Sequence, residues 1–314
     1  MLRAVGEPRR IDRAVRRLQA ALRGIPARGV RLTWRGGELR TTIHWIRDDG
    51  FWFAAEPRGE GPTARLALLL GHAPDPPGRR ESITCEINLA LAGADRKLAG
   101  LVAADEAGTL YLCHSGRMGG SRTGQRKAGF RAYADDAVWR PVTWPDGAER
   151  EALVIAPLDS PRLPRLLGRF VETVHRFKTG APAPACPGLC VEPAVPDSAT
   201  SACDRRLVDV ALHEELAKRG LFGGAEDLFS LRGARPRPLF ALVADARPEE
   251  LALAVGSLSL ASARVGRGVR AILVAPAGLP DPDAAALSSL PFTCVRFRWR
   301  GARAVFDGLD DALA

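Results

Sequence analysis

The sequence predicts two domains: an α+β domain of mostly antiparallel strands with flanking helices, followed by an α/β sandwich. Three observations carry this prediction. Between residues 29 and 156, short alternating segments are separated by Gly- and Asp-containing turns, which is typical of antiparallel strands. Residues 179–201 contain five Pro and no periodic pattern, which indicates a semi-extended linker. Residues 238–246 form an apolar strand that a helical pattern follows directly, as in a sheet covered by helices.

The first domain is predicted to span residues 1–178, and it begins with an amphipathic helix. From Pro8 to Arg23 the apolar side chains recur at helical spacing, and five Arg occupy the opposite face. The segments with strand character that follow are residues 30–34, 39–46, 51–53, 64–70, 81–88, 98–104, 109–114, 138–144 and 151–156. A second amphipathic helix is predicted from Leu163 to Phe177. With 314 residues in all, the chain is long enough for each domain to bury its own core.

The second domain is predicted to span residues 202–314. A helix is expected over residues 204–219, where apolar residues follow a helical period and Gly220 ends it. The expected strands are 226–231, 238–245, 269–275, 292–298 and 304–306. Helices are expected over 248–261 and 281–290, with a short one at the end. Helices on both sides of a mixed sheet make an α/β sandwich.

The positive charge lies almost entirely in the first domain. The net charge is +9, yet residues 1–180 hold 30 Lys and Arg against 20 Asp and Glu. Residues 201–314 hold 15 basic against 14 acidic residues and are therefore close to neutral. This asymmetry predicts a polyanionic partner, nucleic acid, for the first domain. No apolar run approaches the roughly 20 residues that span a bilayer, and the N-terminus lacks an apolar export signal, so a cytoplasmic protein without a membrane partner is expected.

The six cysteines do not form a recognisable metal or disulfide pattern. They are scattered over the chain, and reduced thiols are the expected state. Cys186 and Cys190 have the spacing of half a zinc site, but no second pair stands at ligand spacing. No metal and no cofactor is therefore predicted.

A basic, Gly-rich stretch from His114 to Arg131 is the main candidate for phosphate contact. It holds five Gly, no acid, and five basic side chains: Arg117, Arg122, Arg126, Lys127 and Arg131. Gly lets backbone N–H groups approach a phosphate, and Arg adds charge-assisted hydrogen bonds. A nucleotide-binding P-loop is the rival interpretation, but Gln125 and Arg126 stand where its Lys and its Ser or Thr belong. On the first helix, Arg13 and Arg17 are further candidates for contact with a phosphate backbone.

The strand at 238–245 and the helix after it resemble the core of the PD-(D/E)XK, or restriction-endonuclease-like, superfamily. In the active branch that the chain resembles, the strand carries an acid-x-Lys pair and the helix a Gln after Val-Gly. Ala241, Val243 and Ser257 occupy these positions here. Neither Ala nor Val can bind a metal or carry charge, so the resemblance implies a nuclease fold with a degenerate active site.

A surviving nuclease site would need other acids. Asp227 matches the first Asp of the superfamily, and Glu214 or Glu215 its helical Glu. Asp245 is the one acid near the strand, four residues beyond Ala241. If the protein were active, these four residues would be the catalytic candidates, and Asp227 and Asp245 would bind Mg²⁺. The expectation is that no catalytic residue and no metal ligand remains.

Residues 86–97 and the Gly-rich stretch after them resemble a domain that precedes nuclease cores in bacterial restriction-like proteins. This resemblance implies a setting in bacterial defence or DNA modification. The first hypothesis is therefore a nucleic-acid-binding protein, with DNA favoured over RNA, that carries an inactive nuclease-like domain. Two alternatives remain open: a Mg²⁺-dependent endonuclease with a migrated site, and a protein-interaction subunit of a larger complex. A homodimer or a partner protein is compatible with each of them.

Overall fold

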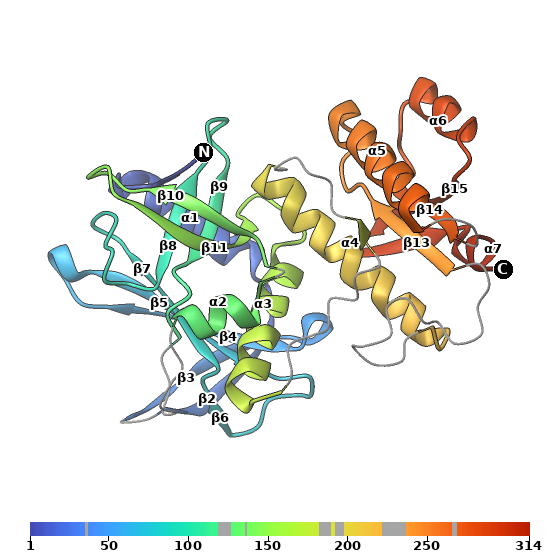
Figure 1. Cartoon of the computed structure of the whole chain (residues 1–314). Coiled ribbons are helices and arrows are strands. Elements are labelled where there is room, and N and C mark those ends of the chain that lie inside the picture. The colour runs from blue at the N-terminus through green and yellow to red at the C-terminus, as the bar shows by residue number, and fades with distance from the viewer. Residues whose placement is uncertain are drawn as a thin grey trace. The chain divides into compact units, whose positions relative to one another are not determined.

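The computed structural model describes residues 1–34, 37–118, 127–135, 137–181, 190–191, 198–221, 237–265 and 269–314. The chain divides into two compact units, Met1–Pro184 and Ala185–Ala314 (Figure 1). The division falls within the segment 179–201 that the sequence predicts as a linker. Each unit contains its own sheets and its own buried apolar core.

A small closed barrel forms one half of the first unit. Its strands are β1 (Leu2–Ala4), β8 (Gly100–Ala104), β9 (Leu110–His114), β10 (Trp139–Thr143) and β11 (Glu149–Pro157). They follow one another around the barrel in the order β1-β10-β11-β9-β8. The barrel closes through β1, which pairs in parallel with β10 and antiparallel with β8. The side chains of β8 and β9 are all buried.

A six-stranded sheet forms the other half of the first unit. Its strands, in spatial order, are β6 (Arg80–Ser82), β2 (Ile25–Trp34), β3 (Gly37–Ile46), β4 (Phe51–Arg58), β5 (Arg65–His72) and β7 (Cys85–Ala90). All neighbours are antiparallel except β2 and β6, which are parallel. One face of the sheet has its own core, in which the Trp52 ring lies directly over Gly71. A Cβ at residue 71 would lie 2.1 Å from the indole, so this position requires Gly.

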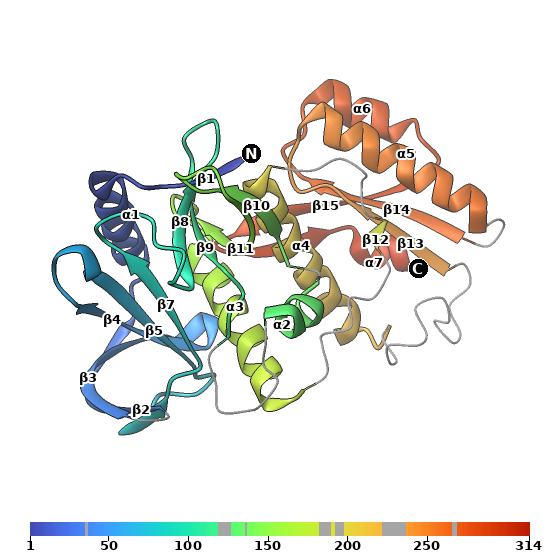
Figure 2. The same cartoon turned by 60° about the vertical axis from the view of Figure 1, so that its left-hand side comes forward.

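Three helices complete the first unit: α1 (Pro8–Ala21), α2 (Lys127–Tyr133) and α3 (Leu163–Thr179). The long helix α3 contacts β5, β7 and β11, and therefore joins the barrel to the sheet. Both views show α3 between these strands, with α2 beside its C-terminal half (Figure 2). Gly168 permits the close approach of α3, because a Cβ there would lie 2.8 Å from the backbone oxygen of Asp49.

The second unit is a parallel sheet with one antiparallel edge. Its order is β12 (Cys190–Val191), β13 (Arg237–Leu242), β14 (Val269–Pro276), β15 (Thr293–Arg300) and β16 (Arg303–Asp307). The first four strands are parallel, and β16 is antiparallel to β15. The helices are α4 (Ala199–Lys218), α5 (Pro248–Val265), α6 (Asp281–Ser288) and α7 (Leu309–Leu313).

The sheet of the second unit is buried on both faces. Phe240, Ile272 and Phe297 face a core that includes α4 and α7. Ala241, Leu273 and Leu258 belong to a second core on the side of α5 and α6. This two-sided burial explains why β13 and β14 are continuous apolar runs in the sequence. Figure 2 shows α5 and α6 together on one face of the sheet.

The predicted mixture of helices and sheets is confirmed, with an antiparallel α+β first unit and helices on both sides of the second sheet. Three elements were not predicted: β1, β12 and α2, the last of which occupies the end of the predicted basic loop. The prediction of one strand over 81–88 was wrong, because this segment forms two strands, β6 and β7, at opposite edges of the six-stranded sheet. Helix α4 begins at Ala199 and β12 at Cys190, so the second unit starts inside the predicted linker. The predicted strand 226–231 lies outside the described residues. No helix in the described ranges combines the length and apolar character that crossing a membrane requires.

Candidate nucleic-acid interface

The start of the basic stretch is fixed by a buried histidine. His114 ends β9 and is 1% exposed. Its Nδ1 accepts a hydrogen bond of 3.0 Å from the backbone N–H of Gly116, and its ring lies 5.4 Å from that of Phe170 on α3. Met118, four residues further on, is also buried. Residues 114–118 are therefore held against the core, while the side chain of Arg117 between them is exposed.

The surroundings of His114 keep its imidazole neutral. Burial lowers the pKa of His114 to about 4, and repulsion from Lys178 acts in the same direction. A backbone hydrogen bond with Glu86 opposes both effects but is weaker than burial. A neutral imidazole keeps one ring nitrogen as an acceptor, whereas a protonated one has none. The hydrogen bond from Gly116 therefore depends on the neutral form.

Lys178 fixes the C-terminal end of α3 next to this histidine. Its Nζ donates a hydrogen bond of 2.7 Å to the backbone oxygen of Thr84, and burial lowers the pKa of its ammonium group. The neighbouring Cys85 is buried, and burial raises the pKa of its thiol to about 12. A thiol that stays protonated is neither a nucleophile nor a metal ligand at neutral pH. We therefore assign this group of residues a positioning role.

The end of the basic stretch is fixed by an aromatic cluster. Phe130 on α2 is fully buried, and its ring lies 5.3 Å from Phe177 and 6.4 Å from Trp139. The indole N–H of Trp139 donates a hydrogen bond of 2.8 Å to the backbone oxygen of Ala134, just after α2. Both ends of the basic stretch are thus attached to the same helix, α3, through Phe170 and Phe177.

Arg131 is engaged within the unit rather than free for a ligand. Its guanidinium lies 5.0 Å from the centre of the Trp139 ring, and its Nε is 3.2 Å from a carboxylate oxygen of Glu151. An Arg with such a partner offers less net charge to a phosphate. The prediction that Arg131 contacts nucleic acid is therefore weakened by its local ion pair.

The other predicted contacts differ in their surroundings. Arg117 and Arg13 are exposed and form no ion pair with the residues that the structure describes. Arg122 and Arg126 lie outside the described residues, and Lys127 begins α2.

Arg17, in contrast, pairs with Asp159 at 2.8 Å. Asp159 lies just before α3, whereas Phe177, which α2 contacts, lies near the end of α3. At 1.5 Å per residue, the two ends of α3 are roughly 20 Å apart. The Arg17 side of α1 and helix α2 therefore lie near opposite ends of α3.

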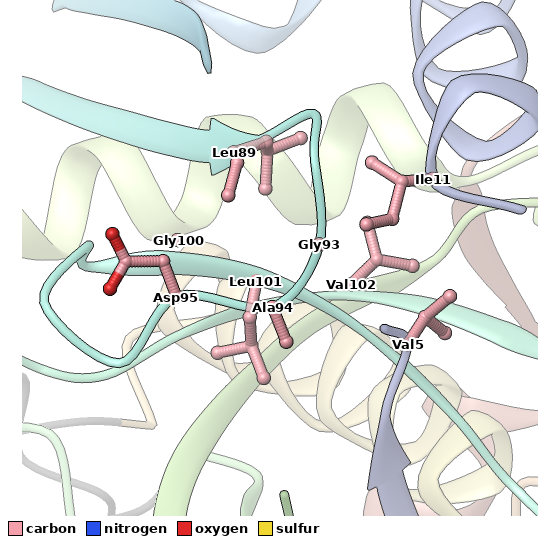
Figure 3. Close-up of a pocket in the computed structure, with 10 residues that line it drawn as sticks. Val5, Ile11, Leu89, Gly93, Ala94, Asp95, Gly100, Leu101 and Val102 are labelled. Atoms are coloured by element: carbon pink, nitrogen blue, oxygen red, sulfur yellow. The ribbon is translucent and has the colours of Figure 1, made fainter. Parts of the chain in front are cut away.

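A small pocket lies where residues 86–100 meet α1 (Figure 3). Its walls are apolar, with Val5 and Ile11 on one side and Leu89 and Leu101 on the other. The cavity volume is about 10 Å³, which is the room that a single water needs. The carboxylate of Asp95 at its rim accepts a hydrogen bond of 2.8 Å from the backbone N–H of Lys97. This pocket is a packing gap and has no room for a nucleotide or a base.

The positions expected to match the acid-x-Lys pair lie in the closed core of the second unit. Ala241 is 0% exposed and Val243 is 2% exposed, and both belong to the core on the side of α5. Ser257 is half-buried on α5 itself. A charged side chain at residue 241 or 243 would be surrounded by apolar atoms, so these positions form no catalytic surface in this chain.

Those of the other nuclease candidates that the structure describes do not converge. Asp245 follows β13 and pairs with Arg247 at 2.9 Å. Arg247 also pairs with the buried Glu250. Glu250 in turn accepts a hydrogen bond of 2.9 Å from Ser201 on α4. Glu215 lies 14 residues further along α4, roughly 21 Å from Ser201. Two ligands of one metal ion must lie within a few ångströms of each other.

The carboxylate of Glu215 is also engaged elsewhere. It binds Lys218 and Arg219, and hydrogen bonds from these two side chains hold its pKa below the usual range. Glu214 is exposed on the same helix. Asp227 lies outside the described residues. Among the residues that are described, no group of three or more His, Cys, Asp or Glu side chains is placed to hold a metal ion. The migrated site that combines Asp245 with Glu214 or Glu215 is therefore not assembled.

Comparison with known proteins provides no relative: no protein-family model, no curated protein and no solved structure matches the chain.

Sequence reasoning missed the buried residues that hold the basic stretch. On α3, His175 is half-buried and stacks on His72, with ring centres 4.3 Å apart. His114 and Lys178 are 64 positions apart, and only the folded chain brings them together. A His at the end of an apolar strand, directly before a Gly-rich basic run, is the one signal in the local sequence that could have pointed to this site.

Proposed function

We propose that the chain is a nucleic-acid-binding protein, with DNA as its partner, and that the stretch from His114 to Arg131 is the main contact of the first unit. The observation that carries the proposal is that this stretch is attached at both ends to buried residues. The neutral His114 holds Gly116 at one end, and Phe130 holds α2 at the other. Anchoring both ends lowers the entropy that a flexible segment loses on binding.

Charge supports the choice of a polyanion. Residues 1–180 carry a net charge of +10, and the basic stretch itself contains no acid. Phosphates every few ångströms along a strand match such a surface without needing a pocket. The one pocket described above would not admit a nucleotide. Contacts to the backbone, which fix position and not sequence, are therefore the interaction that this unit supports best.

For the second unit we propose a restriction-endonuclease-like domain that has lost its chemistry and serves as a binding or dimerisation surface. The support is the buried pair Ala241 and Val243 on the strand where the superfamily carries its acid and Lys. A place in bacterial defence or DNA modification follows from the resemblance of both domains to restriction-like proteins.

Replacing Arg122, Arg126 and Lys127 together by Ala is expected to weaken binding to a 20-base-pair duplex about a hundredfold at 100 mM salt. Each phosphate contact contributes about 0.9 to the slope of log affinity against log salt, so the slope should fall by nearly three. Fluorescence anisotropy at several salt concentrations measures both quantities. Single-stranded DNA and an RNA duplex of the same length show which nucleic acid is preferred.

The matched control removes three exposed arginines elsewhere in the first unit: Arg3, Arg23 and Arg150. It lowers the net charge equally and should change the affinity much less. Equal losses in the two triple variants would show that only net charge matters and that the stretch is not the contact.

Incubation of supercoiled plasmid with Mg²⁺ or Mn²⁺ tests the endonuclease alternative in the same preparation, with Asp227→Ala as its control.

A further inference from the structure

Three arginines stand side by side across the edge of the six-stranded sheet. Arg31 on β2 is in register with Arg40 on β3 and with Arg80 on β6. Residues that are directly opposite in a sheet point to the same face, and adjacent strands lie about 4.8 Å apart. All three residues are exposed. Figure 1 shows the three strands next to one another. We call these residues the arginine row.

The positive charge of the arginine row is mostly unbalanced. Glu38 on β3 lies 3.8 Å from the Nε of Arg31, and both side chains are well exposed. Within the described residues, Arg40 and Arg80 form no ion pair. Like charges directly opposite each other destabilise a sheet, so such a row is unfavourable unless an anion lies across it.

Another arginine pair in the same sheet has a carboxylate within hydrogen-bond distance of one of its members, which makes the contrast informative. Arg58 and Arg65 are also directly opposite, on β4 and β5. There the guanidinium of Arg58 donates a hydrogen bond of 3.2 Å to Glu86, and both side chains are about two-thirds buried. At this pair the sheet supplies a half-buried carboxylate that accepts a hydrogen bond from one arginine. The arginine row has only the exposed Glu38.

We propose that the arginine row is a second phosphate-binding surface, which receives the backbone of one nucleic-acid strand. The row is about 10 Å long, as three neighbouring strands require. Phosphates of one strand recur about every 3.4 Å along a duplex axis, so two or three of them face a row of this length. Planar guanidinium groups bind phosphate oxygens in pairs of hydrogen bonds, which suits closely spaced Arg better than Lys. This inference rests on the proposed function and adds a contact that the basic stretch does not include.

The test replaces the arginine row by Gln in the full chain: Arg31→Gln, Arg40→Gln and Arg80→Gln together. Binding of a 20-base-pair duplex is measured from 50 to 300 mM salt. We expect the affinity at 100 mM salt to fall by a factor of ten to a hundred and the salt slope by about two, because Glu38 already offsets one of the three charges. The triple variant of Arg3, Arg23 and Arg150, each changed to Gln, is the matched control.

Stability provides a readout that does not need a ligand. Removing like charges from one row should leave the melting temperature unchanged or raise it at 20 mM salt, and the difference should shrink at 500 mM salt. The single variant Arg40→Gln, which breaks no ion pair among the residues that the structure describes, should show the same direction. A row variant that is less stable than the wild type at low salt would show a structural role and overturn the proposal.

The outcomes separate the two proposals. No duplex binding by the wild type overturns both of them. Binding by the wild type that the row variant and its control weaken equally overturns the arginine row alone. A third measurement compares the affinities of the wild type and the row variant for a polyglutamate peptide of matched charge. If the row variant loses affinity for polyglutamate as strongly as for DNA, the surface recognises an acidic polypeptide and the assignment to phosphate is wrong.

Discussion

Replacing Phe130 by Ala is expected to lower the free energy of unfolding of the first unit by about 3–5 kcal/mol, the range for removing a buried aromatic ring. Phe130 is fully buried and lies edge-on to both Phe177 and Trp139. Helix α2 has only seven residues, too few to be stable alone. Without the ring, α2 should detach, and the basic stretch should lose the anchor at its C-terminal end.

Urea unfolding of the wild type and the Phe130→Ala variant measures this loss, and hydrogen exchange of residues 127–133 shows whether α2 opens first. Tyr133→Phe serves as the control, because it keeps the ring that lies 5.2 Å from Phe177 and removes only the hydroxyl. A loss below 1 kcal/mol would mean that Phe130 adds little to the packing of α2. Weaker duplex binding by a still-folded Phe130→Ala variant would connect the position of α2 to function.

Acidification from pH 7.5 to pH 4 is expected to cost the first unit roughly 3 kcal/mol through His114 alone. The pKa of His114 is about 4 in the folded chain, against an ordinary value of 6.5. Between these two values the unfolded chain binds the proton and the folded chain does not, so stability falls as the pH falls. Each pKa unit corresponds to about 1.4 kcal/mol. Burial also lowers the pKa of His72, which adds to the loss in the same direction.

The His114→Asn variant isolates this contribution, because an amide oxygen can still accept the hydrogen bond from Gly116 but does not titrate. Its stability between pH 7.5 and pH 4 should decline less steeply than that of the wild type. His44→Asn is the control, since His44 is half-buried and stacks on Phe53, away from His114 in the sequence. Parallel pH profiles for His114→Asn and the wild type would show that His114 is not the titrating group.

Local patterns predicted most of the elements, because the forces that form them are local. The period of apolar residues places α1 and α3 within two residues of their observed ends, and the continuous apolar run predicts β13. The missed elements are short: β1 has three residues and β12 two, and both exist only through pairing with distant strands. Helix α2 contains Gly129 and no amphipathic period. It depends on the contact of Phe130 with α3, which the sequence does not reveal.

The candidate site was harder to predict than the fold. Composition alone indicates that basic residues gather in the first unit. Which of them keep their charge available depends on partners that are far away in sequence. Asp159 neutralises Arg17 across 142 positions, and Glu151 neutralises Arg131 across 20. The arginine row has the same origin, because strand register sets it and the spacing of Arg31, Arg40 and Arg80 along the chain does not suggest it.

The closure of the barrel has a consequence for the order of folding. Strand β1 is made before the other strands of the barrel, yet one of its two neighbours, β10, lies about 140 residues later in the chain. Contacts between such distant residues form slowly, because a long loop must close before they bring any gain. In a nascent chain, one edge of β1 therefore stays unpaired until β10 has left the ribosome, and one edge of the apolar strand β9 stays unpaired until β11 has left it. This interval is when the first unit is most exposed to aggregation, and mutations in Leu2 or Ala4 should reduce the yield of folded protein more than its final stability.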